Sequence, residues 1–375
     1  MKAFVKFRRL ALASAAVGLA MATGLGIASA QMAPLEIPFV DEWAGSPHAN
    51  GNGEPFNHWN EEGEIPPACA RCHSTPGFQD HIGADGTPPG VDRPARIGTV
   101  IACVACHNHV TRQMTSVTFP SGIEIKELKP ASARCMQCHQ GRESTISVNE
   151  ALKGQTPDAV SEKLQFINIH YRAAGATRYG AEVKGAYEYE GKNYAGFYEH
   201  SPNFTQCSDC HGLHSVKVKV AECAGCHKTP ADIRKKEDLP KIRKKMTDDY
   251  DGDGNTAEGI GEEIDALQVA LLAAIQTYAK DVAGTPLLYD SHSYPYFFKD
   301  KNGNGKADPG EAIYPNRYKS WTPRLLKAAY NYQFSLKDPG VYTHNPRYVI
   351  QTLYDSLADL GTKVKVNMAG MHRPK

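Results

Sequence analysis

The sequence predicts a mainly α-helical fold with much irregular structure, in two regions that follow an N-terminal leader. Five copies of a Cys-x-x-Cys-His motif lie between residues 69 and 227, in a stretch rich in Gly, Pro, Asn and Tyr that has few periodic segments. The last 148 residues contain none of these motifs, and apolar residues recur there at helical spacing. We therefore predict a leader at 1–30, a motif-bearing domain at 31–236 and a helical C-terminal region at 237–375.

The five motifs use all 10 cysteines of the chain and have the spacing of c-type haem attachment sites. In such a site two thiols add to the two vinyl groups of one porphyrin, and the adjoining imidazole binds the iron as its proximal ligand. The predicted attachment residues are Cys69, Cys72 and His73; Cys103, Cys106 and His107; Cys135, Cys138 and His139; Cys207, Cys210 and His211; and Cys223, Cys226 and His227.

Disulfides and zinc are the two other interpretations of these cysteines. Neither explains why His follows the second Cys in every copy. Since His makes up 15 of the 375 residues, chance would give five such repeats about once in ten million. We therefore expect five covalently bound c-type haems. Their large apolar faces would form most of the core of a multihaem cytochrome c domain.

The leader has the pattern of a secretory signal peptide. Four basic residues precede an apolar run from Leu10 to Ile27, and Ala28-Ser29-Ala30 is an A-x-A cleavage pattern. An uncleaved membrane anchor is the alternative. We expect an exported protein, in the periplasm, at the cell surface or outside the cell. No membrane span is expected after cleavage, because the only other strong apolar run, residues 267–275, is short.

The charge balance argues against nucleic acid as a partner. The chain has 42 Lys and Arg against 41 Asp and Glu, and loss of the leader takes its formal charge from +1 to about −3. We expect redox proteins as partners, one an electron donor and one an acceptor. A basic run follows the last motif and is either a solvated linker helix or a site that docks an acidic partner or neutralises haem propionates. It comprises Arg234, Lys235, Lys236, Lys241, Arg243, Lys244 and Lys245.

The sixth ligand of each iron decides between an electron carrier and an enzyme, because chemistry at iron needs an open coordination position. Ten histidines outside the motifs are available for five irons. His109 and His214 follow the proximal His107 and His211 so closely that we expect each to ligate a neighbouring haem. Candidate distal ligands are His48, His109, His170, His200, His214 and His344, with Met114, Met368 and Met371 as alternatives.

Short motifs around three histidines resemble those of a known group of multihaem cytochromes c. They are Trp43–Ala49, which reads W-x-x-S-x-H-A, the pair His211 and His214, and His344-Asn345-Pro346. The group includes cytochrome c nitrite reductase, hydroxylamine oxidoreductase and octahaem tetrathionate reductase. The resemblance covers mainly residues 43–227 and 344–348, and it implies distal ligand roles for His48, His214 and His344.

The sequence also departs from that group. Nitrite reductases share a Cys-x-x-Cys-Lys active-site haem, whereas every motif here ends in His. Hydroxylamine oxidoreductases carry more haems and a cross-linking tyrosine, which cannot be matched to any one of the 18 tyrosines here. We expect five bis-histidine haems of low potential, since a Met ligand would raise it. This favours electron transfer in anaerobic or extracellular respiration over enzymatic catalysis.

Two alternative functions remain open at this point. One is a multihaem reductase of a small nitrogen or sulfur oxyanion, in which one iron lacks a distal histidine. The other is a subunit of an extracellular cytochrome filament, in which copies of the chain associate and donate a histidine to one another.

The C-terminal region contains two calcium-type loops, for which a turn-rich polar loop is the alternative. The stretch from Asp300 to Glu311 places oxygen donors at loop positions 1, 3, 5, 9 and 12, with Gly at position 6, as in an EF-hand. A second loop begins at Asp249, but its position 12 is Ile260, so Glu258, Glu262 or Glu263 would have to close it. Candidate ligands are Asp300, Asn302, Asn304, Lys306 through its carbonyl, Asp308 and Glu311, and in the second loop Asp249, Asp251 and Asp253.

Three helices are predicted around these loops, at 261–283, 323–334 and 346–360, the last two after the N-caps Thr322 and Asn345. Another is predicted at 157–166, where Thr156-Pro157 offers an N-cap and a first-turn proline. We expect the C-terminal helices to pack on one another and on haem edges, with His344 reaching one iron. An independent helical domain without a ligand role is the alternative.

Overall fold

The computed structural model describes residues 36–228 and 233–375, so the predicted signal peptide lies outside the described residues. The chain divides into two compact units, Met1–Val40 and Asp41–Lys375. The second contains all five motifs and the whole C-terminal region. No helix within the described ranges is long and apolar enough to cross a bilayer.

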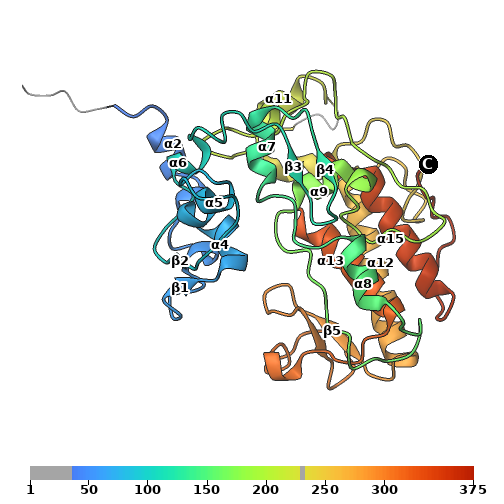
Figure 1. Cartoon of the computed structure of the whole chain (residues 1–375). Coiled ribbons are helices and arrows are strands. Elements are labelled where there is room, and N and C mark those ends of the chain that lie inside the picture. Colours follow the sequence, from blue (N-terminus) through green and yellow to red (C-terminus); the bar gives the residue numbers. More distant parts are fainter. Residues whose placement is uncertain (1–35, 229–232) are drawn as a thin grey trace, which may run out of the picture. The chain divides into compact units, whose positions relative to one another are not determined.

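Short helices joined by irregular segments make up the motif-bearing part of the chain (Figure 1). The helices are α2 Val40–Ala44, α3 Glu54–Asn57, α4 Pro67–His73, α5 Thr75–His81, α6 Cys103–Cys106, α7 Pro130–Met136, α8 Thr145–Leu152, α9 Ala174–Tyr179, α10 Cys207–Cys210 and α11 Val220–Ala224. Single 3₁₀ turns are η1 Pro47–Ala49, η2 Gly180–Glu182, η3 Lys236–Lys241 and η4 Tyr314–Asn316.

Prolines and capping side chains fix where several of these short helices begin. Pro67 and Pro130 are the first residues of α4 and α7, where the missing N–H costs nothing. The Ser74 hydroxyl accepts a hydrogen bond from Gly77 N at 2.9 Å and caps α5. In the same way Ser144 begins α8 with a capping box.

The strands form three separate antiparallel pairs rather than one sheet. They are β1 Glu64–Ile65 with β2 Ala95–Arg96, β3 Val117–Thr118 with β4 Glu124–Ile125, and β5 Leu287–Tyr289 with β6 Phe297–Lys299. The described fold is therefore mainly helical with much irregular structure, as the sequence predicts.

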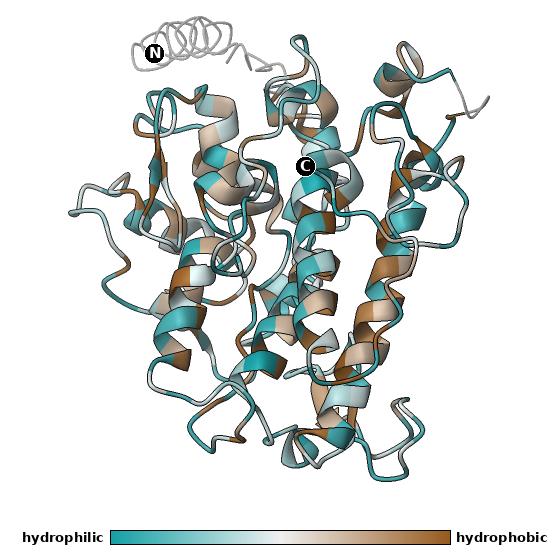
Figure 2. Ribbon diagram, turned by 90° about the vertical axis from the view of Figure 1, so that its right-hand side faces the viewer, coloured by the Kyte–Doolittle hydropathy of each residue, from teal (hydrophilic) through white to brown (hydrophobic). Residues whose placement is uncertain are grey.

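Three long helices form the C-terminal region and confirm the three predicted there. They are α12 Ile260–Asp281, α13 Pro323–Lys337 and α15 Pro346–Gly361, with the short α14 Val341–His344 between the last two. Thr322 Oγ1 accepts from Leu325 N at 3.2 Å and Asn345 Oδ1 from Tyr348 N at 3.1 Å, so both predicted N-caps are present. Each helix carries both polar and apolar stretches (Figure 2).

The helix predicted at 157–166 is wrong, because this segment consists of turns and irregular backbone. Its polar groups are taken by the C-terminal helices instead. Pro157 O accepts from Arg324 N at 3.0 Å, and the Asp158 carboxylate accepts from the Arg324 guanidinium at 2.7 Å. Ser161 N donates to Trp321 O at 2.9 Å. These tertiary bonds outweigh the local preference for a helix.

One large apolar core joins the C-terminal helices to part of the motif-bearing region. Leu271 of α12, Leu325 of α13 and Leu353 of α15 are fully buried in it, and burying each such side chain contributes about 1.5–3 kcal/mol. Met136 of α7 and Val148 of α8 belong to the same core. The helical bundle thereby positions the third motif, which begins within α7.

Candidate haem-binding centres

Each motif occupies a short helical turn that brings its first Cys and its His to one side. His107 N donates to Cys103 O at 2.8 Å, and His139 N to Cys135 O at 3.0 Å. The fourth and fifth motifs have the same bond, each at 2.9 Å, and the first motif lies inside α4. All ten cysteines are free, so the thiols are available for attachment.

The histidine of every motif faces one histidine from another part of the chain. No histidine serves two motifs. The pairs, with the distances between ring centres, are His73 and His170 at 5.8 Å, His107 and His214 at 6.1 Å, His139 and His48 at 6.2 Å, His211 and His344 at 6.4 Å, and His227 and His200 at 5.9 Å.

The spacing of these pairs fits an iron between the two rings. A ligating nitrogen lies about 2 Å from its metal and about 1 Å from its own ring centre, so two axial imidazoles have centres about 6 Å apart. Ordinary aromatic pairs also span this range. However, the angle between the ring planes varies from 12° to 80°, so no common stacking geometry explains the five pairs. The pairing of every motif histidine with a different partner favours metal ligation.

Hydrogen bonds to Nδ1 leave Nε2 as the ligating atom in several rings. His73 Nδ1 lies 2.7 Å from Pro55 O, His139 Nδ1 lies 3.1 Å from Arg172 O, and His211 Nδ1 lies 3.3 Å from Val216 O. A carbonyl oxygen only accepts, so in each ring Nδ1 carries the proton and Nε2 keeps its lone pair. This is the usual outer contact of a metal-binding histidine.

Burial favours the neutral imidazole that a metal requires. It lowers the pKa of both His139 and His170 to about 4. Burial also lowers the pKa of His48 and of the other four motif histidines. His344 differs: burial acts to lower its pKa, but the neighbouring Asp338 carboxylate raises it above the usual value.

His170 is held in an unusual backbone conformation. Its φ is 77°, a left-handed value that a side chain with a Cβ rarely adopts, and Arg172 has a φ of 57°. His170 N donates to Asn168 Oδ1 at 3.0 Å, and Arg172 N donates to Lys337 O at 2.7 Å. Such strain costs of order 1–3 kcal/mol and is typical of functional sites. It fits a backbone shaped to present the His170 ring.

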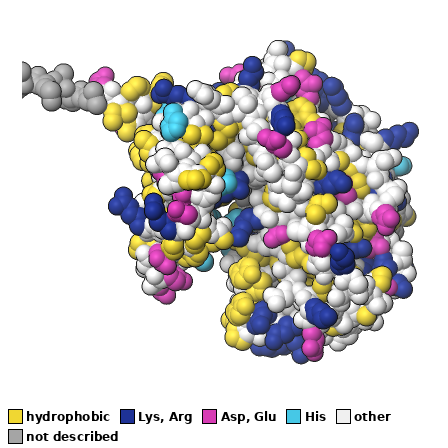
Figure 3. All heavy atoms as spheres, in the orientation of Figure 1, with side chains coloured by type: hydrophobic (Ala, Val, Ile, Leu, Met, Phe, Trp, Pro, Cys, Tyr) yellow, Lys and Arg dark blue, Asp and Glu magenta, His cyan; other side chains and the backbone are white. Residues whose placement is uncertain are grey.

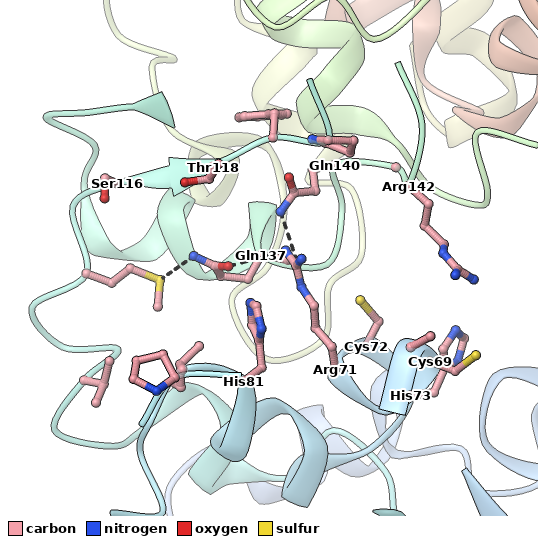
Figure 4. A pocket seen from close by; sticks show the side chains of 18 of the residues that line it. Cys69, Arg71, Cys72, His73, His81, Ser116, Thr118, Gln137, Gln140 and Arg142 are labelled. Carbon is pink, nitrogen blue, oxygen red and sulfur yellow. Dashed lines mark hydrogen bonds between the residues drawn. The ribbon is translucent and has the colours of Figure 1, made fainter. Parts of the chain in front are cut away.

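A cavity of about 980 Å³ adjoins the first motif (Figure 4). Cys69, Cys72 and His73 line one part of it, together with His170. Its volume is at the upper end of the range for ligand sites in proteins. Arg71 and Arg142 also line it, and guanidinium groups suit carboxylates such as those of a porphyrin.

Two polar atoms in the wall of this cavity fit a polar ligand. Arg71 Nε and Gln140 Oε1 are buried and have no hydrogen-bond partner. Buried polar atoms in native proteins are nearly always hydrogen-bonded. The two unpaired atoms here therefore fit a bound polar group that supplies the missing partner. The residues present therefore fit a haem at the first motif.

The third motif contacts three of the other motifs. Arg71 of the first motif donates to Gln137 O of the third, and the Cys138 and Cys135 side chains lie within hydrogen-bonding reach of Cys72 in the first motif and Cys207 in the fourth. Arg134 donates to Cys106 O of the second motif at 2.8 Å. The fifth motif follows the fourth through Lys219, whose N donates to Cys210 O at 2.8 Å. The first motif thus contacts the third directly, although the second lies between them in the sequence.

His109 stands apart from the five pairs. It lines the cavity beside the first motif, and no histidine ring lies against it in the described part of the chain. The other five distal candidates each face a motif histidine. Sequence analysis missed Asp338, which accepts from His344 Nδ1, because no motif links residues that lie six positions apart in an irregular turn.

Carboxylates of Asp300, Asp308 and Glu311 hydrogen-bond within the loop from Asp300 to Glu311. Asp300 accepts from Gly303 N and Gly305 N, both at 2.7 Å, and Glu311 accepts from Lys301 N at 2.8 Å. The Asp308 carboxylate accepts from the side-chain amides of Asn302 and Asn304, each at 2.7 Å. Asp300 and Glu311 are both only 4% exposed. These bonds hold the loop together.

The second acidic loop gathers five carboxylates. Those of Asp249, Asp251 and Asp253 lie within 4.8 Å of one another, and Asp251 is equally close to Glu258 and Glu263. Burial, followed by the nearby carboxylates, raises the pKa of Glu258 to about 7. The loop therefore closes through Glu258 and Glu263, whereas Glu262 accepts from Gly259 N at the start of α12.

The basic run after the last motif is not an α-helix, so its interpretation as a linker helix is wrong. Lys236–Lys241 form the single 3₁₀ element η3, which contains Pro240. Arg243 pairs with the fully buried Glu263 and is itself only 8% exposed, so the acidic loop takes up its charge. Lys244 and Lys245 are exposed.

Comparison with known proteins gives relatives of one kind. The chain is 27% identical over 354 residues to the C-type polyheme cytochrome OmcB of Geobacter sulfurreducens, which covers 80% of this chain and 45% of that protein. It is 25% identical over 395 residues to the C-type polyheme cytochrome OmcC of the same organism, covering 88% of this chain and 48% of that protein. The chain spans about half the length of these relatives. No protein-family model and no solved structure matches it.

Proposed function

We propose that this chain, a multihaem c-type cytochrome, transfers electrons along five bis-histidine haems between a donor and an acceptor protein in respiration. The observation that carries the proposal is the pairing of all five motif histidines with five different histidines. Each haem, when bound, supplies an iron that gains or loses one electron. With histidine on both faces, the chain leaves no open position for a substrate.

The same observation bears on the two alternatives. A reductase of nitrogen or sulfur oxyanions would need one motif histidine without a partner. A filament that shares histidines between copies would also leave one motif short within the chain. All five partners come from this chain, which favours a self-contained electron carrier.

The contacts between motifs favour a series of haems centred on the third. The third motif and its helix α7 are bonded to the first motif through Arg71 and Gln137 O, to the second through Arg134 and to the fourth through Ser132 and Cys207 N. The segment that leads into the fifth motif is bonded to the fourth through Lys219. The segments beside the first and second motifs are also bonded to each other, because Ala102 N donates to Thr75 Oγ1. We propose that electrons enter or leave at the first and second motifs on one side and at the fifth on the other.

The fifth motif is the end best suited to a protein partner. No residue of α11 is buried, and Cys226 is exposed. On the face in Figure 3, acidic and basic side chains are interspersed. The positive charges of Lys244 and Lys245 act on His227 and His200, the two histidines paired at the fifth motif, and help burial to lower their pKa. An acidic redox protein is the partner that such a site would attract.

We also propose that both acidic loops bind Ca²⁺ and thereby stiffen α12. Calcium takes six to eight oxygen ligands, which carboxylates and backbone carbonyls supply in loops of this kind. The second loop is joined to the first turn of α12 by Glu263, which accepts from Tyr250 N at 2.8 Å. The EF-hand-like loop is joined to the last turns of α12 by Gln276, which donates to Gly305 O at 2.8 Å.

An exported, haem-loaded protein is the form in which these proposals apply. The leader pattern at 1–30 supports export, because covalent haem attachment takes place outside the cytoplasm. Whether the mature chain stays in the periplasm or reaches the cell surface is a question for fractionation of the producing cells.

Anaerobic redox titration in solution tests the function. The fully reduced protein should return about five electrons per chain to a one-electron acceptor, as one per motif requires. Nitrite and sulfite should leave it reduced. Rapid reoxidation by either oxyanion would instead support the reductase.

A further inference from the structure

The distal ring of the fourth pair has an outer contact that differs from those of the other rings. His344 faces His211 on one side, and its Nδ1 lies 2.7 Å and 3.0 Å from the two oxygens of Asp338. The other Nδ1 bonds described for the pairs end on backbone carbonyls, of Pro55, Arg172 and Val216. Among the Nδ1 bonds described for the pairs, that of His344 is thus the one that ends on a carboxylate.

The fold holds this carboxylate firmly. Asp338 is the C-cap residue of α13 and is only 2% exposed. Its Oδ1 accepts from Gly340 N at 3.0 Å, and the Thr177 side chain also bonds to it. Both carboxylate oxygens of Asp338 are thus fixed in place on the Nδ1 side of the His344 ring.

Gly340 lets the imidazole come this close. A Cβ on Gly340 would lie 2.7 Å from Cε1 of His344 and 3.0 Å from its Nδ1, closer than side-chain carbons pack. Any larger residue at 340 would push the ring away from Asp338. The turn after α13 therefore brings the Asp338 carboxylate, Gly340 and the His344 ring into contact.

We propose that Asp338 is a positioning residue that lowers the reduction potential of the haem at the fourth motif below those of the other four. The inference rests on the proposed bis-histidine function, in which His344 is the distal ligand. A carboxylate that accepts the Nδ1 proton makes Nε2 a stronger electron donor. Stronger donation and a buried negative charge both favour the oxidised, more positive iron.

Because the fourth motif lies between the third and the fifth, a lower reduction potential there would affect how electrons pass between them. Cys207 N donates to Ser132 Oγ of α7, the helix in which the third motif begins, and Lys219, in the segment that leads into the fifth motif, donates to Cys210 O. A haem of low potential at the fourth motif would make electron transfer from the third motif towards the fifth, beside the exposed Lys244 and Lys245, energetically uphill. Asp338 would therefore govern how fast electrons reach that end.

The test is Asp338→Asn in the haem-loaded protein, with Asp355→Asn as the matched control. Asn keeps an oxygen acceptor for Nδ1 but removes the charge. Asp355 is an equally buried carboxylate, which pairs with Arg373 rather than with a histidine. Spectroscopic redox titration resolves the five haems, and electron paramagnetic resonance (EPR) reports the spin state of each.

In Asp338→Asn we expect the reduction potential of one haem, the lowest of the five, to rise. At a fixed potential its ratio of reduced to oxidised form should rise at least about tenfold, which is 59 mV for one electron. The reduction potentials of the other four haems should not change beyond experimental error, and Asp355→Asn should change the potential of none of the five. Asp338→Glu, which keeps the charge, should restore a low potential. Thr177→Val should give a smaller shift of the same sign, and it serves if Asp338→Asn fails to fold.

Two failures can be told apart. Low-spin spectra for all five haems with unmoved potentials in Asp338→Asn and Thr177→Val would overturn the role of Asp338 alone. A high-spin haem in the unaltered protein would overturn the bis-histidine assignment on which it rests.

Discussion

His48 and His139 lie ring to ring with centres 6.2 Å apart, although 91 residues separate them in the chain. His48 belongs to η1 at the start of the described fold, and His139 ends the third motif. The N-terminal segment that contains His48 thus contacts the third motif, which has the most contacts to other motifs. Ligation at this point would join the start of the motif-bearing region to its middle.

Removing a paired distal histidine should open one iron. We expect His48→Ala to convert one haem from low spin to high spin and to let cyanide bind there, because within the described residues no second histidine faces His139. EPR of the oxidised protein measures this. The control is His109→Ala, which should leave all five low-spin. High-spin signals in His109→Ala, or none in His48→Ala, would contradict the pairing.

Calcium content should follow the two acidic loops separately. We expect two Ca²⁺ per chain after dialysis, and one in either Asp300→Ala or Asp251→Ala. Metal analysis gives the count, with the exposed Glu61→Gln as control. At a free calcium concentration of 100 Kd, one site adds about 2.7 kcal/mol to the free energy of unfolding, which chelation would remove. Unchanged occupancy in a variant would rule out that loop.

Side chains on opposite faces of α12 should differ sharply in their contribution to stability. Leu271 is fully buried against α13 and α15, whereas Val269 is 71% exposed. Leu271→Ala should lower the free energy of unfolding by about 2–5 kcal/mol, and Val269→Ala should change it by no more than about 0.5 kcal/mol. Denaturant unfolding of both variants checks the packing of the bundle. Equal losses would contradict it.

Asp158 should stabilise the fold only while it is ionised. Burial acts to raise its pKa, but bonds from Arg324 and Tyr278 lower it to about 2. Its stabilising effect is therefore complete above pH 4 and is lost as the pH falls toward 2. At neutral pH, Asp158→Asn should cost about 1 kcal/mol after allowance for solvent screening. Unfolding of both proteins at pH 7 and pH 2.5 measures this. A difference that persists at low pH would argue against the ion pair.

The helical turns of the Cys-x-x-Cys-His motifs are local features of the sequence. Five residues such as Cys135 to His139 form one helical turn wherever the chain places them, and the EF-hand pattern from Asp300 to Glu311 is equally self-contained. Likewise Thr322 and Asn345 mark their helices through bonds that span three residues. Such features depend little on the rest of the fold.

The partners of these local features could not be predicted, because they depend on tertiary contacts. Sequence analysis named His170 and His200 as distal candidates but could not pair them with His73 and His227. It missed Asp338 for the same reason. The helix at 157–166 failed because Arg324 bonds to Asp158 across 166 positions and holds the segment in another conformation.

Electron paramagnetic resonance of the oxidised, haem-loaded protein, before and after addition of nitrite, sulfite and cyanide, tests the central claim most directly. The five histidine pairs predict that all five haems are low-spin and that none of the three ligands alters any of them. A high-spin haem that shifts on addition of one of these ligands would contradict the electron-transfer function and mark the site of an enzyme.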